Sequence, residues 1–237
     1  MRIIIALVAL LIFPSSLLLA QDATDKVNSN AIPPSIVKPS MDFVMVQVAY
    51  NDWLQKPDSI KTKGFGYTFN AYLCYDFPIK KTNLSFAAGL GVNTSVIYLA
   101  GQEVRNTDTG SGPLAIVPVP DTVKRSKFVT TYLTAPFELR YFYHRDNRNK
   151  GFKAAIGLTV GTLMGADSKV LTAIDGTNVK YKDDTKRYVT PWNFAGTARI
   201  GWGNVCIFGS YNLTNVFKPN VGPPITPASV GICLTGL

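Results

Sequence analysis

A long alternation of apolar side chains with small or polar ones constrains the fold of this chain more than any other feature. From residue 65 to residue 77 (FGYTFNAYLCYDF) every odd position is apolar and most even positions are small or polar. The same two-residue period returns in residues 129–144 and 152–161. Because successive side chains of a β-strand point to opposite faces, this period predicts long strands that separate two unlike environments. No helical period competes with it.

Eight strands are predicted when the alternation is followed along the chain. Several are longer than the usual globular strand of about 5–6 residues. Their lengths suit a tilted strand that crosses a bilayer, which needs roughly 9–11 residues. The predicted strands occupy residues 42–50, 64–77, 84–99, 127–144, 152–163, 188–202, 205–216 and 227–236.

The connections between these strands alternate in length. The long ones are 51–63, 100–126, 164–187 and 217–226, and the short ones are 78–83, 145–151 and 203–204. Gly203-Asn204 is expected to form a two-residue hairpin turn. Long external loops and short periplasmic turns are typical of outer-membrane barrels. We therefore predict an all-β fold, an eight-stranded antiparallel up-and-down transmembrane β-barrel with both termini in the periplasm.

The less apolar face of the strands favours a membrane barrel over a soluble one. A face in bulk water should carry many Lys and Glu side chains, whereas the even positions from 66 to 76 hold one charge, Asp76. Small side chains fit the narrow interior of a closed eight-stranded barrel. The main alternative is a soluble periplasmic lipocalin-like binder of small ligands.

Aromatic girdles, which are typical of membrane interfaces, are also predicted. They consist of Tyr75, Phe77, Tyr141, Tyr143 and Trp202 on the turn side and of Phe65, Tyr67, Tyr98, Tyr188 and Trp192 on the loop side.

The N-terminal residues have the features of an export signal. Arg2 precedes an apolar run over residues 3–13, and Leu18-Leu19-Ala20 comes before a polar Gln21. This pattern predicts a signal peptide over residues 1–20 that is cleaved after Ala20. Residues 21–40 are polar and contain three prolines, so we expect a flexible periplasmic leader. The barrel domain is predicted to cover residues 41–237, in the outer membrane.

Charged side chains are predicted on the inward face near the turn side of the barrel. Because unpaired charges are costly to bury, we expect these side chains to form a salt-bridged plug. A gate or proton path is the functional alternative for the same residues. A filled interior leaves little room for solute flow, which disfavours a general porin. The inward charges are Asp76, Glu138, Arg140, Lys153 and Arg199.

Candidates for catalysis and cofactor binding are few. His144 is the one histidine and is predicted at the periplasmic rim, so we do not expect an enzyme; a lipid-modifying barrel enzyme is the further alternative. Cys74, Cys206 and Cys233 have no metal-ligand spacing, and we expect neither a metal nor a cofactor. Free interior thiols are the expected state, with a Cys206–Cys233 disulfide as the alternative.

The net charge of +9 points to an anionic partner. Nucleic acid is excluded because an exported chain rarely meets it, so lipopolysaccharide or another anionic lipid surface fits better. The long loop 164–187 carries the candidate contacts for a lipid or protein partner. They are Lys180, Lys182, Lys186 and Arg187.

Several segments together resemble the PorT-like small outer-membrane β-barrels of Bacteroidota. They are NDWLQKPDSIKTKGFGYTFNAYLCYDFPI, LSFAAGLGV, TTYLTAPFELRYF and FKAAIGLTVGTLMG, and the resemblance covers most of residues 41–237. It implies a Gram-negative cell envelope and an outer-membrane location. Some members of that family are associated with type IX secretion. The resemblance therefore implies a non-enzymatic role that is structural, adhesive or accessory to envelope assembly or secretion.

Overall fold

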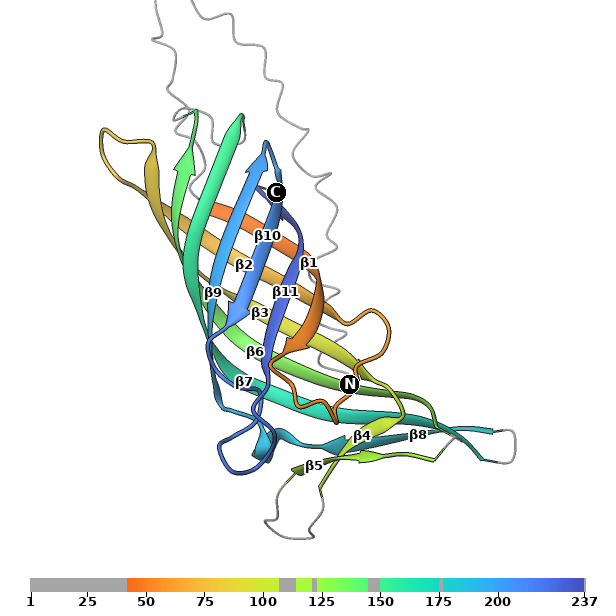
Figure 1. The fold of residues 1–237 in the computed structure, drawn as a ribbon. Coiled ribbons are helices and arrows are strands. Elements are labelled where there is room, and N and C mark those ends of the chain that lie inside the picture. The colour runs from red at the N-terminus through yellow and green to blue at the C-terminus, as the bar shows by residue number, and fades with distance from the viewer. Residues whose placement is uncertain (1–41, 107–113, 121–122, 145–149, 175–176, 237) are drawn as a thin grey trace, which may run out of the picture. The chain divides into compact units, whose positions relative to one another are not determined.

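Eight long strands pair in a closed antiparallel ring in the computed structural model of the chain (Figure 1). The signal peptide and the leader predicted at residues 1–40 lie outside the described residues, which belong to one compact unit, 39–237. The structure describes residues 42–106, 114–120, 123–144, 150–174 and 177–236.

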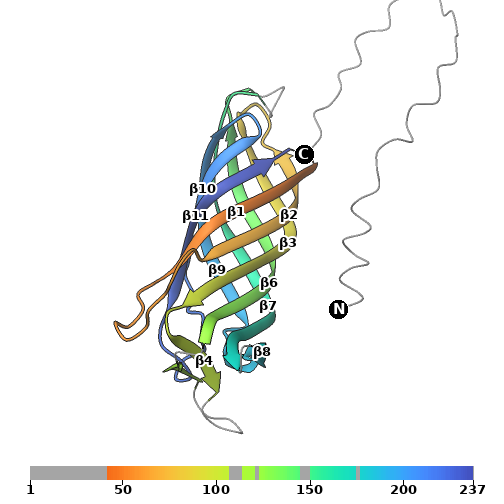
Figure 2. The ribbon, with the colours of Figure 1, turned by 90° about the vertical axis from the view of Figure 1, so that its right-hand side faces the viewer.

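The ring follows the order of the strands in the chain, and its last strand pairs with its first. Because β11 pairs with β1, the wall has no unpaired edge strand, and the predicted barrel is confirmed (Figure 2). The ring strands are β1 (Asp42–Leu54), β2 (Tyr67–Pro78), β3 (Leu84–Leu99), β6 (Val123–Phe142), β7 (Phe152–Ile174), β9 (Trp192–Trp202), β10 (Val205–Asn212) and β11 (Thr226–Thr235).

The predicted strand positions agree closely with the ring. The predicted strand 84–99 coincides with β3. Val205 pairs with Trp202 across the predicted Gly203-Asn204 turn, where Gly203 has a φ of 60° that suits glycine. The predicted strand 188–202 begins too early, because the 3₁₀ turn η1 (Lys186–Tyr188) comes before β9.

Two predicted long loops contain strands, so this part of the prediction is wrong. The connection 100–126 holds a hairpin of β4 (Gln102–Asn106) and β5 (Leu114–Pro118). Strand β7 continues well past residue 163 and pairs with β8 (Thr177–Asp184) beyond the ring. A β-bulge explains why the alternation did not reveal the second half of β7. Thr131 pairs with Gly165 and Tyr132 with Leu163, so Met164 is unpaired and the inward parity reverses.

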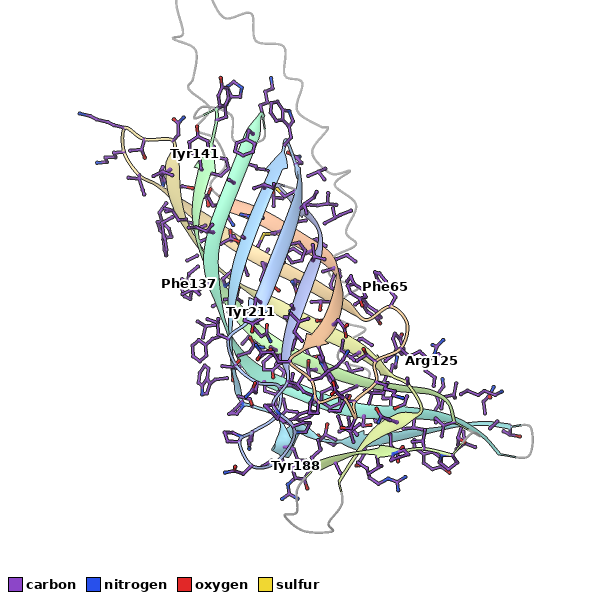
Figure 3. The ribbon with its side chains drawn as sticks, in the orientation of Figure 1. Phe65, Arg125, Phe137, Tyr141, Tyr188 and Tyr211 are labelled. Atoms are coloured by element: carbon purple, nitrogen blue, oxygen red, sulfur yellow. The ribbon has the colours of Figure 1, made fainter. Side chains whose placement is uncertain are left out.

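Apolar side chains cover the outside of the ring. Figure 3 shows Phe137 and Tyr141 on the outer side of the wall, and both are exposed. Exposed aromatic residues mark both ends of the wall, as predicted, except that Tyr98 is only partly exposed and Tyr188 is buried among the loops. Within the described part of the chain, no helix is long and apolar enough to cross a membrane. Further exposed apolar residues of the wall are Val48, Leu73, Leu90, Ile156, Leu158, Ile200, Ile207, Val230 and Ile232.

Candidate functional site: the barrel interior

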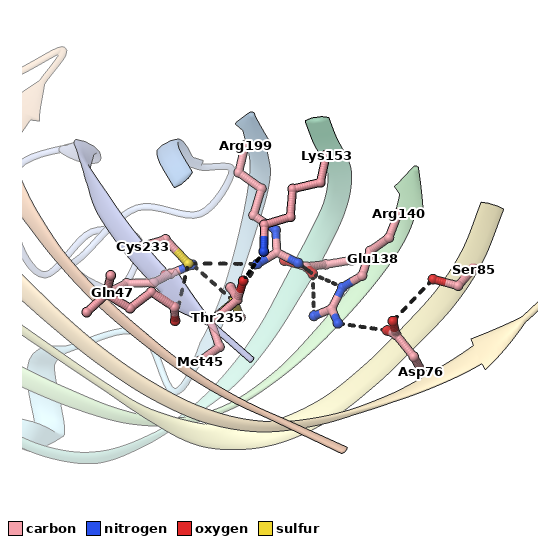
Figure 4. A network of polar contacts seen from close by, with 11 residues as sticks. Met45, Gln47, Asp76, Ser85, Glu138, Arg140, Lys153, Arg199, Cys233 and Thr235 are labelled. Carbon is pink, nitrogen blue, oxygen red and sulfur yellow. Dashed lines mark hydrogen bonds and ion pairs between the residues drawn. The ribbon is translucent and has the colours of Figure 1, made fainter. Parts of the chain in front are cut away.

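The five predicted inward charges all lie inside the ring, near the end where the chain turns are short. They come from β2, β6, β7 and β9, and each is at least 91% buried (Figure 4). We call them the charge cluster. Its members are Asp76, Glu138, Arg140, Lys153 and Arg199.

Four members of the charge cluster form a chain of ion pairs. The Nη1 of Arg140 donates to the Oδ1 of Asp76 at 2.7 Å, and its Nε donates to the Oε2 of Glu138 at 2.8 Å. The Nη2 of Arg199 donates to the same Oε2 of Glu138 at 2.6 Å. Ser85 contributes a weaker bond, because its hydroxyl lies 3.4 Å from the Oδ2 of Asp76. Glu138 therefore joins the two arginines, and Arg140 joins the two carboxylates.

Small residues between the strands make room for these pairs. Ala87 lies between Asp76 and Glu138 in the ladder, since it pairs with both. Ala155 likewise pairs with both Arg140 and Arg199. Long side chains can therefore cross the intervening strand and meet above a methyl group. This arrangement closes the turn end of the interior with charges that neutralise one another.

Lys153 is joined to the interior through a hydroxyl group rather than through a carboxylate. Its Nζ donates to the hydroxyl of Thr235 at 2.6 Å. Beside it, the thiol of Cys233 accepts long contacts from Gln47 at 3.7 Å and from Arg199 at 3.8 Å. The predicted plug thus includes a neutral polar rim that the sequence did not indicate.

Glu138 needs the glycine opposite it in the ladder. Gly157 pairs with Glu138, and a Cβ at Gly157 would clash with the carbonyl oxygen of Phe137 and lie 2.9 Å from the Cγ of Glu138. Gly157→Ala should therefore displace β6 at Phe137 and Glu138 and lower the free energy of unfolding by about 1–3 kcal/mol, as overpacking usually does. Chemical unfolding followed by tryptophan fluorescence measures the change. Gly196→Ala is the matched control, because the space around Gly196 is open and its effect should be near zero. Equal effects of the two substitutions would contradict this account.

Amide and hydroxyl side chains fill the middle of the interior. Asn70 donates to Gln47 at 2.8 Å and accepts from Asn93 at 2.5 Å, and Asn51 donates to Ser95. Two cavities of about 40 Å³ each lie among these side chains. A cavity of this size has room for a few water molecules and not for a solute.

The loop end of the interior is closed by a second, apolar cluster, which we call the apolar cap. Its centre is an aromatic trio in which the ring of Phe217 lies 6.2 Å from that of Trp53 and 5.5 Å from that of Phe128. Side chains from four connections cover this trio. The apolar cap consists of Trp53, Ile60, Ile97, Leu99, Val104, Leu114, Phe128, Tyr132, Ala166, Tyr188, Val189, Val216, Phe217 and Ile225.

Backbone hydrogen bonds tie the connections of the apolar cap to one another. Leu114 donates to the carbonyl of Val221 at 2.8 Å, and Lys218 donates to that of Tyr188 at 3.0 Å. Ala100 donates to the carbonyl of Lys61 at 2.8 Å. The loop end is therefore an ordered structure with its own core. Sequence reasoning missed it, although apolar Val104, Leu114 and Ile225 in supposed loops were a signal.

The four cationic residues predicted as loop contacts do not form one group. Lys180 and Lys182 lie on β8, whereas Lys186 and Arg187 lie in η1. Lys182 pairs with Asp167 at 3.2 Å, and the guanidinium of Arg187 lies 5.7 Å from the centroid of the Tyr188 ring. All four side chains are exposed.

The three thiols are buried, whereas the imidazole of His144 is exposed. Cys206 and Cys233 are direct partners between β10 and β11, both are buried, and both are free thiols, as is Cys74. His144 is exposed just beyond β6, and its ring packs edge-on against Tyr143 at 4.9 Å. No group of three or more metal-ligating side chains occurs among the described residues.

The closed ring and its apolar outside define the class of protein. A sheet without edge strands satisfies its own backbone hydrogen bonds and is one of the two structures that can span a bilayer. The chain is a membrane β-barrel protein. The family model described as "Outer membrane protein beta-barrel domain" matches residues 40–218, and the chain belongs to this family.

Comparisons with individual proteins are less informative than the family model. No curated protein matches the chain. Similar solved structures include three mutants of a porin from Rh. blastica, each 9% identical, covering 82% of this chain and 99% of the porin chain with a TM-score of 0.21. A TM-score this low says nothing about conduction by the present barrel.

Proposed function

We propose that this chain is a non-conducting, non-enzymatic outer-membrane barrel that holds an ordered platform at its loop end. The observation that carries this proposal is the closure of the interior at both ends. The charge cluster fills the turn end and the apolar cap fills the loop end. The cavities between them, of about 40 Å³, are too small for a solute. A sealed barrel acts through its surfaces rather than through transport.

A measurement of ion currents tests this proposal directly. The full chain, refolded and recognised by a heat-dependent shift in gel mobility, should give no stepwise currents in a planar lipid bilayer. Both seals would have to open before ions could pass, and breaking a buried ion pair costs about 3–5 kcal/mol. Regular open-channel steps of porin size would contradict the proposal. A porin measured in the same bilayers serves as the positive control.

The finer role that we propose is accessory to envelope assembly or protein secretion, with a structural or adhesive role as the alternative. It is supported by the resemblance to PorT-like barrels and by the ordered loop end, since a rigid surface suits a binding partner. In a Gram-negative strain that lacks the chain, secreted cargo should accumulate in the periplasm. Unchanged secretion with weakened outer-membrane integrity or surface adhesion would instead support the structural or adhesive role.

A further inference from the structure

Part of the wall continues beyond the ring as a three-stranded sheet formed by the ends of β6 and β7 and by β8. Ser126 and Phe128 on β6, and Ser168 and Val170 on β7, are buried on one face of this sheet. Their alternate neighbours therefore lie on the other face, which continues the outside of the wall. We call the cations on this outer face the basic flange. They are Arg125, Lys127, Lys169, Lys180 and Lys182.

The register places three lysines of the basic flange in one row. Lys127 pairs with Lys169, and Lys169 pairs with Lys182. Side chains directly opposite in antiparallel strands have Cβ atoms about 4.5–5.5 Å apart, and like charges there repel. Tyr98 on β3 extends the row, since it pairs with Lys127. The guanidinium of Arg125 lies over the Tyr98 ring, 5.6 Å from its centroid.

Acidic residues neutralise only part of this charge. Asp167 accepts from Lys169 at 3.5 Å and from Lys182 at 3.2 Å. Asp184 is its partner in the ladder and lies on the same face. Five cations against these two carboxylates leave an excess of three positive charges on one face of the sheet. Partial burial and the charges of Lys169, Arg125 and Lys180 lower the pKa of Lys127, which lies beyond the apolar wall. An anion bound here would relieve that repulsion.

The basic flange begins where the apolar wall ends. On the outer face of β6, Phe137 and Leu133 are exposed and apolar, and the next outward residues are Thr131, Val129 and then Lys127. Figure 3 shows Arg125 beyond Phe65 on the loop side of the barrel. Aromatic and apolar residues of the wall end at the level of the lipid head groups. We therefore expect the cations that follow to lie at the height of the lipid phosphates.

We propose that the basic flange binds the phosphate groups of an anionic glycolipid in the outer leaflet. Ammonium and guanidinium groups form strong charge-assisted hydrogen bonds with phosphate. The row of lysines offers several donors on one surface, and the apolar wall below it offers contacts for the acyl chains of the same molecule. A lipid would contact both the lysines and the apolar wall, whereas a free phosphate ion would contact the lysines alone.

The test uses the full chain refolded in zwitterionic micelles and titrated with lipid A that carries two phosphate groups, with calorimetric detection. In the flange variant, Lys127→Gln, Lys169→Gln and Lys182→Gln are combined. Each basic side chain near an anionic lipid surface contributes about a fivefold factor in affinity. Since Asp167 already neutralises part of the row, we expect a loss of about tenfold to a hundredfold. Binding by the native chain should also weaken at high salt.

A matched control keeps the same total charge as the flange variant. It combines Lys80→Gln, Lys81→Gln and Lys150→Gln, three exposed lysines at the turn side, and should bind lipid A as the native chain does. Equal losses in the two variants, or no loss in either, would overturn the proposal. So would equal binding of dephosphorylated lipid A, or displacement by inorganic phosphate at matched concentration, which would indicate a free anion as the occupant. If the flange variant does not refold, Lys127→Gln alone should weaken binding about threefold to fivefold, and unchanged binding would again overturn the proposal.

Discussion

Replacing Arg140 with methionine should lower the free energy of unfolding by about 3–5 kcal/mol, the usual cost of removing one partner from a buried ion pair. Arg140 is buried and contacts both Asp76 and Glu138. Methionine keeps most of the side-chain length but donates no hydrogen bond, so both carboxylates lose a charged donor in the interior. Urea unfolding in phospholipid vesicles, followed by the fluorescence of the three tryptophans, measures the change.

An exposed ion pair provides the control for this prediction. Lys182→Met removes the contact with Asp167, but the Lys182 side chain is 62% exposed, so the expected change is about 0–1 kcal/mol. If Arg140→Met had an effect as small as this control, the charge cluster would contribute little to stability.

The Arg140→Met variant also distinguishes a structural plug from a gate. A gate that depends on Arg140 would give ion currents in the variant, whereas a structural plug behind an intact apolar cap would not.

The strand positions could be predicted because inward and outward side chains differ in polarity and alternate every two residues along each strand. Along β3 the large apolar Phe86 and Leu90 face outward and Ser85 faces inward, and the predicted and observed limits of that strand agree. The same parity placed Asp76, Glu138 and Arg140 in the interior without any knowledge of their partners. A closed barrel extends this local rule to the whole ring, since every ring strand has one face toward the narrow interior.

The partners inside the barrel could not be predicted in the same way. The Arg140–Asp76 pair joins residues 64 positions apart in the sequence, across an intervening strand. The choice of partner depends on the register of three strands, and a shift of one residue would turn every side chain of a strand to the other face. For the same reason the sequence allowed a Cys206–Cys233 disulfide without showing that the two thiols are direct partners.

The apolar cap was missed because its contacts are non-local and its strands break the alternation. The bulge at Met164 reverses the inward parity of β7, so the continuing strand did not match the pattern that identified its first half. Tyr188 was assigned to the membrane interface as the first residue of the predicted strand 188–202, but it lies in η1, is 4% exposed and packs in the cap. Residue type predicts an interface only when the strand that carries it is known.

Replacing Phe217 with alanine should open the apolar cap and leave the ring closed. Phe217 is buried and contacts both Trp53 and Phe128, so its truncation should cost about 3–5 kcal/mol of local stability. Cleavage by a protease in the connection 213–225 should become more than about a hundredfold faster, because proteolysis follows the population of the open form. The ring strands pair through contacts that Phe217 does not make, and the heat-dependent gel shift should therefore persist.

Leu213→Ala is the matched control, because Leu213 lies in the same connection and its side chain is 60% exposed. Its cleavage rate should equal that of the native chain. If Phe217→Ala were cleaved no faster than this control, the connections would be held by their backbone hydrogen bonds rather than by the aromatic trio. Phe217→Ala alone should still pass no current, because the charge cluster closes the turn end independently of the apolar cap. Currents in this single variant would mean that the interior has one seal rather than two.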